Sequence, residues 1–198
     1  MKLYRIIAEA QSGRVFETMG QTFGLSDEMA AQVVRYFLPP IRKVLERRCE
    51  TLDGMISVLE FLGSRRCDRV MEDARMFGHA RVSDEGERIV NYLFGDTGYA
   101  RKLIEKRAKV LGVDAAALEK MLPFIAVLAI GAVEKRTRRP LGAVLQRIAK
   151  GETDPKDLLN PYSALAAHLR LRRDGERAGA RRPTLFGSLF TRAEPRAA

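Results

Sequence analysis

The chain has 198 residues, of which 46% are hydrophobic and 30% charged, and it carries a formal net charge of +10. This composition allows one domain with a sizeable core, with or without a tail. Its two cysteines, Cys49 and Cys67, exclude a disulfide scaffold and a cysteine-based zinc site, and we expect two ordinary thiols on helices. The positive charge favours nucleic acid or an anionic membrane surface as a partner.

Glycine, serine and proline divide the chain into predicted helices. Gly24 suits the end of one helix, and Ser26 is a good N-cap for the next. Pro39-Pro40 is expected to break or kink that helix, and Pro140 to start a new one. No segment shows strand alternation, so the chain is predicted to be all-α. The predicted helices span residues 3–10, 13–23, 27–38, 41–48, 51–62, 64–77, 83–94, 99–111, 114–122, 124–133, 140–150 and 161–173.

The longest uncharged run covers thirteen residues, Met121–Val133, and charged residues flank it on both sides. A helix needs roughly 20 apolar residues to cross a bilayer. From Phe124 to Val133 the run is apolar on every side, which is typical of a buried helix. We therefore expect residues 124–133 at the centre of a protein core, with a re-entrant membrane segment as the alternative.

Two stretches of the chain share the same pattern, in which a glycine that ends a helix and a capping residue are followed by a Leu-Pro pair. Gly24-Leu25-Ser26 leads to Leu38-Pro39. In the same way, Gly112-Val113-Asp114 leads to Leu122-Pro123. The spacings differ by four residues, close to one helical turn, so both copies would keep the same buried face. This pattern predicts two pseudo-repeated helix pairs.

Several short motifs resemble, in order and spacing, those of the YidB-like family, bacterial domain of unknown function 937. They are Ile7–Gly13, Phe23–Ser26, Gly86–Val90, Leu93–Gly95, Leu111–Asp114 and Met121–Pro123. The resemblance covers about residues 3–150 and leaves the arginine-rich tail outside. It implies an all-helical, superhelical body, and it brings no established reaction, ligand or catalytic residue.

Residue patterns typical of catalysis or metal binding are weak in this sequence. His79 and His168 do not have metal-ligand spacing. The stretch Gly95–Lys102 faintly resembles a phosphate loop, but it lacks the Gly-Lys-Ser/Thr ending. No serine or cysteine has a recognisable activating partner. We therefore predict no catalytic residues, no metal site, no cofactor and no small-molecule substrate.

Nucleic-acid binding is the alternative function that the charge suggests. A helix that ends at glycine, followed by an N-cap that starts a second helix, is the sequence pattern of a helix-turn-helix unit. However, the second helices begin near Asp27 and Asp114, and acids at that end would repel phosphate. Sequence-independent contact with the backbone remains possible, as does a merely solvated surface. The basic residues available for it are Lys102, Lys106, Lys109, Arg170, Arg172, Arg173, Arg181 and Arg182.

The C-terminal tail contains a short apolar motif between arginine clusters. Its four large apolar residues are Leu185, Phe186, Leu189 and Phe190. They could dock as a short helix into a protein partner or a second copy. They could also enter an anionic membrane surface or fold back on their own body.

Together these observations predict a cytoplasmic, irregular multi-helix superhelical bundle over residues 1–173, followed by a disordered basic tail over residues 174–198. The predicted function is that of a non-enzymatic scaffold or protein-interaction module, which docks to a partner through the tail. Sequence-independent nucleic-acid binding is the alternative function.

Overall fold

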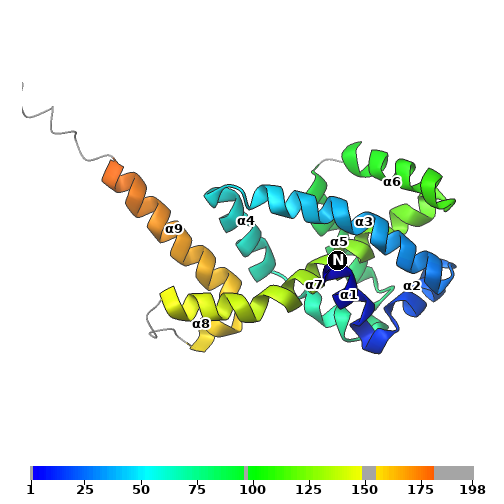
Figure 1. Cartoon of the computed structure of the whole chain (residues 1–198), viewed down its shortest axis with the longest axis horizontal. Helices are drawn as coiled ribbons and strands as arrows, with labels where there is room; N and C mark the ends of the chain where they lie inside the picture. The colour runs from blue at the N-terminus through cyan, green and yellow to red at the C-terminus, as the bar shows by residue number, and fades with distance from the viewer. Residues whose placement is uncertain (1, 96–97, 149–154, 181–198) are drawn as a thin grey trace, which may run out of the picture.

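The computed structural model describes residues 2–95, 98–148 and 155–180 (Figure 1). No strand lies among these residues, and this confirms the all-α prediction. The α-helices are α1 (Lys2–Ala8), α2 (Val15–Phe23), α3 (Asp27–Arg48), α4 (Leu52–Gly63), α5 (Ala80–Phe94), α6 (Gly98–Leu111), α7 (Ala115–Ile148), α8 (Pro155–Leu159) and α9 (Pro161–Ala180). Short 3-10 helices are η1 (Ala10–Gly13), η2 (Cys67–Met71) and η3 (Ala74–Met76).

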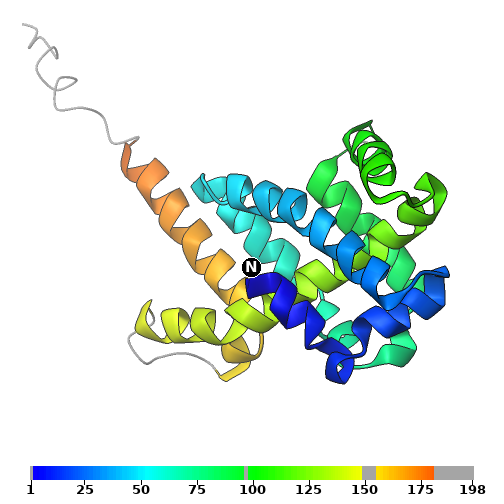
Figure 2. The same ribbon diagram turned by 45° about the vertical axis from the view of Figure 1, so that its right-hand side comes forward.

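Helix α7 is the centre of the fold. It runs through the middle of the molecule, and α1, α3, α5, α6, α9 and η2 pack against it (Figures 1 and 2). Every residue from Phe124 to Ala132 is buried, and Val133 is partly buried. By length and composition α7 could cross a membrane, but 72% of its apolar window is buried inside the protein itself. The prediction of a core segment is therefore confirmed.

The prolines do not end the helices that contain them. Pro39 and Pro40 lie inside the continuous helix α3, and Pro123 and Pro140 lie inside α7. Of the break or kink predicted at Pro39-Pro40, the break is therefore wrong, and so is the new helix predicted at Pro140. An interior proline costs about 3 kcal/mol. Burial of a large apolar side chain returns about 1.5–3 kcal/mol, and α3 buries several of them around its prolines, including Phe37, Leu38 and Ile41.

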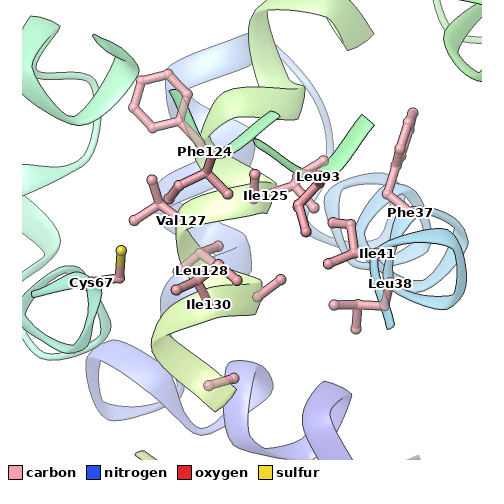
Figure 3. Close-up of a cluster of buried hydrophobic side chains, with 14 of the residues drawn as sticks. Phe37, Leu38, Ile41, Cys67, Leu93, Phe124, Ile125, Val127, Leu128 and Ile130 are labelled. Atoms are coloured by element: carbon pink, nitrogen blue, oxygen red, sulfur yellow. The ribbon is translucent and has the colours of Figure 1, made fainter. Parts of the chain in front are cut away.

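Glycines allow neighbouring segments to come close to α7. A Cβ atom added to Gly86 of α5 would collide with the backbone carbonyl of Pro123. A Cβ atom added to Gly131 of α7 would lie 2.7 Å from the carbonyl oxygen of Cys67 in η2. In Figure 3, α7 side chains such as Leu128 lie between η2 on one side and α3 on the other. Neighbouring segments therefore pack closely against α7 on both sides and form the core.

The two predicted pseudo-repeats share their local geometry. Gly24 ends α2 with φ +69°, and Gly112 ends α6 with φ +65°, a left-handed conformation that glycine adopts without strain. The hydroxyl of Ser26 accepts a hydrogen bond from the N–H of Met29. The carboxylate of Asp114 caps α7 in the same way.

Other elements also differ from the prediction. Residues 64–77 form η2 and η3 instead of an α-helix, partly because the side chain of Asp73 accepts from the N–H of Arg75 and holds a local turn. Helix α5 begins three residues before the predicted start at Ser83. Helix α9 continues past the predicted domain boundary at Arg173 and ends at Ala180. Its glycine, Gly175, costs only about 1 kcal/mol in a helix.

Close packing at Gly131 can be tested by substitution. We expect Gly131→Ala to lower the free energy of unfolding by about 1–3 kcal/mol, because the added methyl group meets the backbone of Cys67. Urea unfolding would measure this change. The matched control is Gly142→Ala on the same helix, where nothing lies within 4 Å of the added Cβ atom. The control is expected to gain about 0.5–1 kcal/mol. Equal effects at both positions would contradict the packing described above.

Candidate protein-interaction site

An apolar groove lies between α1, α3, α4 and α7 and has a volume of about 650 Å³. It is open to solvent, and apolar side chains from all four helices line it. The lining includes Leu3, Tyr4, Leu38, Pro39, Leu45, Met55, Val58, Leu59, Leu62, Val133 and Leu141. The prolines inside α3 place Pro39 on this wall because the helix continues through them. The groove is large enough to hold several apolar side chains of a docked segment.

The rim of the groove is polar and mixed in charge. Arg42 and Glu46 form an exposed ion pair on α3, with Nε and Oε1 3.4 Å apart. Arg136 from α7 lies at the rim as well. Exposed pairs of this kind contribute at most about 1 kcal/mol, so they leave the apolar wall as the main source of binding energy.

Cys49 lies at the mouth of the groove and is exposed. Cys67, by contrast, is 2% exposed and packs against α7. Burial raises the pKa of both thiols above its usual value. Their neighbouring arginines therefore do not activate them. Cys49 is an accessible and unactivated thiol beside the groove.

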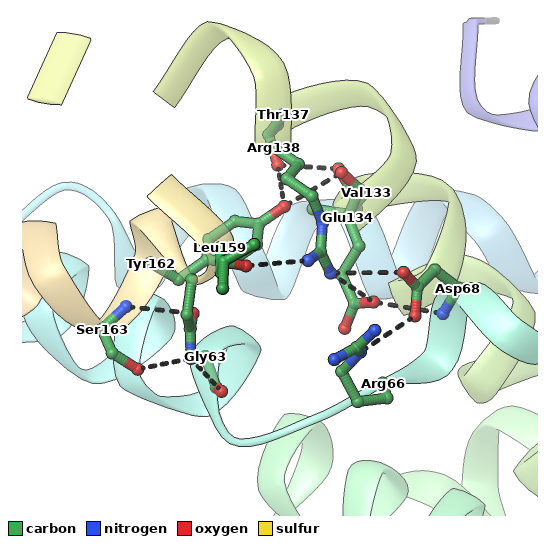
Figure 4. Close-up of polar contacts among 11 residues, drawn as sticks. Gly63, Arg66, Asp68, Val133, Glu134, Thr137, Arg138, Leu159, Tyr162 and Ser163 are labelled. Atoms are coloured by element: carbon green, nitrogen blue, oxygen red, sulfur yellow. Dashed lines mark hydrogen bonds and ion pairs between the residues drawn. The ribbon is translucent and has the colours of Figure 1, made fainter. Parts of the chain in front are cut away.

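A buried polar cluster lies around Glu134, where α7, η2 and α9 meet (Figure 4). Its Oε2 accepts a hydrogen bond from the N–H of Asp68 at 3.1 Å. The guanidinium of Arg138 lies 3.3 Å from the Asp68 carboxylate and 3.8 Å from the Glu134 carboxylate. The hydroxyl of Tyr162 donates to the carbonyl oxygen of Glu134 at 2.9 Å. The cluster thus ties three separate elements together.

The side chain of Glu134 is 0% exposed, and this burial raises its pKa to about 7. The hydrogen bond from Asp68 and the charge of Arg138 lower the pKa, whereas the negative charge of Asp68 raises it. A carboxyl group with a pKa near 7 is suited to proton transfer. Here, however, Asp68, Arg138 and Tyr162 surround Glu134. Their contacts hold η2 and α9 against α7. We read the cluster as structural.

From the sequence alone, Glu134 is one of the charged residues that flank the apolar run. Its position contained a usable signal. Glu134 lies seven residues after Val127 and four after Ile130, both of which are buried. Helical spacing therefore places its side chain on the buried face.

The structure separates the basic residues that the nucleic-acid alternative combined. Lys102, Lys106 and Lys109 are exposed on α6, as their spacing indicated. Helices α6 and α9 lie at opposite ends of the molecule in both views (Figures 1 and 2). The lysines and the arginines of α9 therefore do not form one surface.

Two arginines of α9, Arg170 and Arg173, pair with acidic residues of α4. Arg170 contacts Glu60 with Nη2 and Oε1 2.5 Å apart, and Arg173 contacts Asp53 with Nη1 and Oδ1 2.7 Å apart. Arg172 is exposed on the same helix. The remaining predicted site residues lie outside the described part of the chain. These are Arg181, Arg182, Leu185, Phe186, Leu189 and Phe190.

Comparison with known protein families gives a match. The model of a family described as bacterial protein of unknown function, DUF937, matches residues 5–136. The chain belongs to this family. The match confirms the resemblance seen in the motifs and ends inside α7, so α8, α9 and the tail lie beyond it. No curated protein and no solved structure matches the chain.

The raised pKa of Glu134 predicts how the stability of the protein depends on pH. Because its folded-state pKa of about 7 lies above the usual 4.5, its contribution to stability is complete below pH 4.5 and is lost as pH rises through 7. Between pH 5 and pH 8 the protein should lose up to about 3 kcal/mol relative to a Glu134→Gln variant. Urea unfolding of both proteins across this range would measure the difference.

The control for this prediction is Glu119→Gln, at an exposed position on the same helix. This control should follow the pH dependence of the unsubstituted protein. If Glu134→Gln also follows it, the raised pKa of Glu134 is refuted.

Proposed function

We propose that this chain is a non-enzymatic, cytoplasmic interaction module that engages a protein partner through the apolar residues of its C-terminal segment. The observation that carries the proposal is the anchoring of α9. This helix lies along α4, where Arg173 contacts Asp53 near the turn between α3 and α4, and its last turns project beyond the body (Figures 1 and 2). The four apolar residues of the tail would then begin from a fixed point.

Buried contacts anchor α9 more strongly than its charges do. Tyr162, Leu165 and Ala166 are buried against the body. Gly63 of α4 allows a close crossing, since an added Cβ atom would collide with Ser163. The ion pairs of Arg170 and Arg173 are partly exposed, and pairs open to solvent contribute about 0–1 kcal/mol each. They align α9 on α4 and leave the arginines farther along the tail to strengthen contact with a partner.

Sequence-independent nucleic-acid binding is the second candidate. The exposure of Lys102, Lys106 and Lys109 on α6 favours it. With Arg101, which is also exposed, α6 offers four exposed basic residues. This is a small electrostatic footprint, because each neutralised phosphate contributes separately to affinity. Arg170 and Arg173 of α9 lie at the far end of the molecule and pair with α4. Protein binding through the tail therefore has the stronger support.

Affinity capture from a bacterial lysate tests the proposal. The test variant replaces Leu185, Phe186, Leu189 and Phe190 with serine in the full chain. The matched control replaces Thr184, Ser188 and Thr191 with alanine, in the same segment. We expect a defined set of proteins to be captured by the unsubstituted chain and the control, and at least tenfold less of each by the test variant.

Two outcomes would contradict the proposal. Equal capture by all three proteins would show that the apolar residues play no role in binding. Loss of capture after nuclease treatment would favour the nucleic-acid alternative.

A further inference from the structure

We propose that the C-terminal segment, residues 183–190, occupies the apolar groove between α1, α3, α4 and α7 of its own chain. The groove would then shield the segment until a partner competes for it. This inference deepens the proposed function and rests on it, because it uses the same four apolar residues. In this proposal the tail segment fills the groove, and its release from the groove controls its binding to a partner.

The groove presents apolar surface that remains open to water in the described structure. Leu3, Tyr4, Met55, Val133 and Leu141 line it and are only partly buried. They come from α1, α4 and α7, so the surface belongs to helices that are far apart in the sequence. An exposed apolar groove bordered by polar residues is a typical binding surface.

Helix α9 runs past the turn between α3 and α4, which borders this groove. Ser163, near its start, contacts Gly63 at the end of α4, and Arg173 contacts Asp53 at the beginning of α4. The two helices are therefore antiparallel, and α9 runs toward the turn between α3 and α4. Cys49, at the mouth of the groove, lies in that turn. The chain thus leaves the body close to the mouth.

The remaining length of chain is sufficient for the segment to turn back. Helix α9 carries the chain about 10 Å past Arg173 to Ala180, at 1.5 Å per residue and away from the body (Figures 1 and 2), so the tail must span that distance back. From Ala180 to Leu185 the chain can span up to about 17 Å, and to Phe190 about 34 Å. The apolar residues can therefore reach the mouth of the groove and enter it.

The chemistry of the segment matches the groove. Residues 183–190, with the sequence PTLFGSLF, carry no charge. Leu185, Phe186, Leu189 and Phe190 have the i, i+1, i+4, i+5 spacing that puts four side chains on one face of a short helix. An apolar helix face in an apolar groove is a common mode of peptide recognition.

The rim does not select the segment by charge. It carries Arg42 and Arg136 as well as Glu46, so the arginines that flank the segment gain no net attraction there. Apolar fit is therefore what would hold the segment in place.

The reactivity of Cys49 reports on occupation of the groove. Cys49 is exposed at the mouth, whereas Cys67 is buried. We would measure the rate of alkylation of Cys49 in the full chain by mass spectrometry, at one fixed pH. Alkylation should be at least fivefold slower in the unsubstituted protein than in the variant with serine at positions 185, 186, 189 and 190. The control with alanine at positions 184, 188 and 191 should react as slowly as the unsubstituted protein.

A peptide of residues 181–192, added to the serine variant, should restore the slow rate. A slow rate that depends on protein concentration would show that a second copy fills the groove and would overturn the intramolecular contact. Equal rates in all three proteins would also overturn it. In that case capture of a partner could still succeed, so the proposed function would survive. If Cys49 is protected but capture fails, the contact stands and the proposed function falls.

Discussion

The burial of one apolar stretch, Phe124–Ala132 on α7, is the constraint on which the rest of the structure depends. A helix that is apolar on every side must be covered on every side. Its neighbours achieve this by close approach, and Gly86 and Gly131 remove the side-chain atoms that would prevent it. Because α1, α3, α5, α6, α9 and η2 all contact α7, the packing of each element depends on this single helix.

The turns of α7 that follow the apolar stretch connect the core to the proposed interaction surface. Glu134 and Thr137 contact Tyr162 and so help to anchor α9. On the neighbouring face, Val133, Thr137 and Leu141 line the groove. One short part of α7 therefore positions both the helix from which the tail begins and the groove that we propose as its docking site. A change in this region would affect both.

Local signals in the sequence were sufficient for some features. The caps at Ser26 and Asp114 and the left-handed glycines before them are encoded by neighbouring residues. The burial of Phe124–Ala132 followed from its composition alone. The continuity of α3 and α7 through their prolines did not follow, because tertiary burial outweighs a local preference. The groove could not be predicted either, since it depends on the spacing of four helices from distant parts of the chain.

Native-state hydrogen exchange in aqueous buffer, without lipid or detergent, tests the central claim about α7 most directly. If Phe124–Ala132 forms the dry core of the protein, its amides should be among the slowest in the chain to exchange. Their exchange free energy should then equal the free energy of global unfolding. Rapid exchange of these amides in buffer, or protection that arises only when lipid vesicles are added, would contradict the architecture described above.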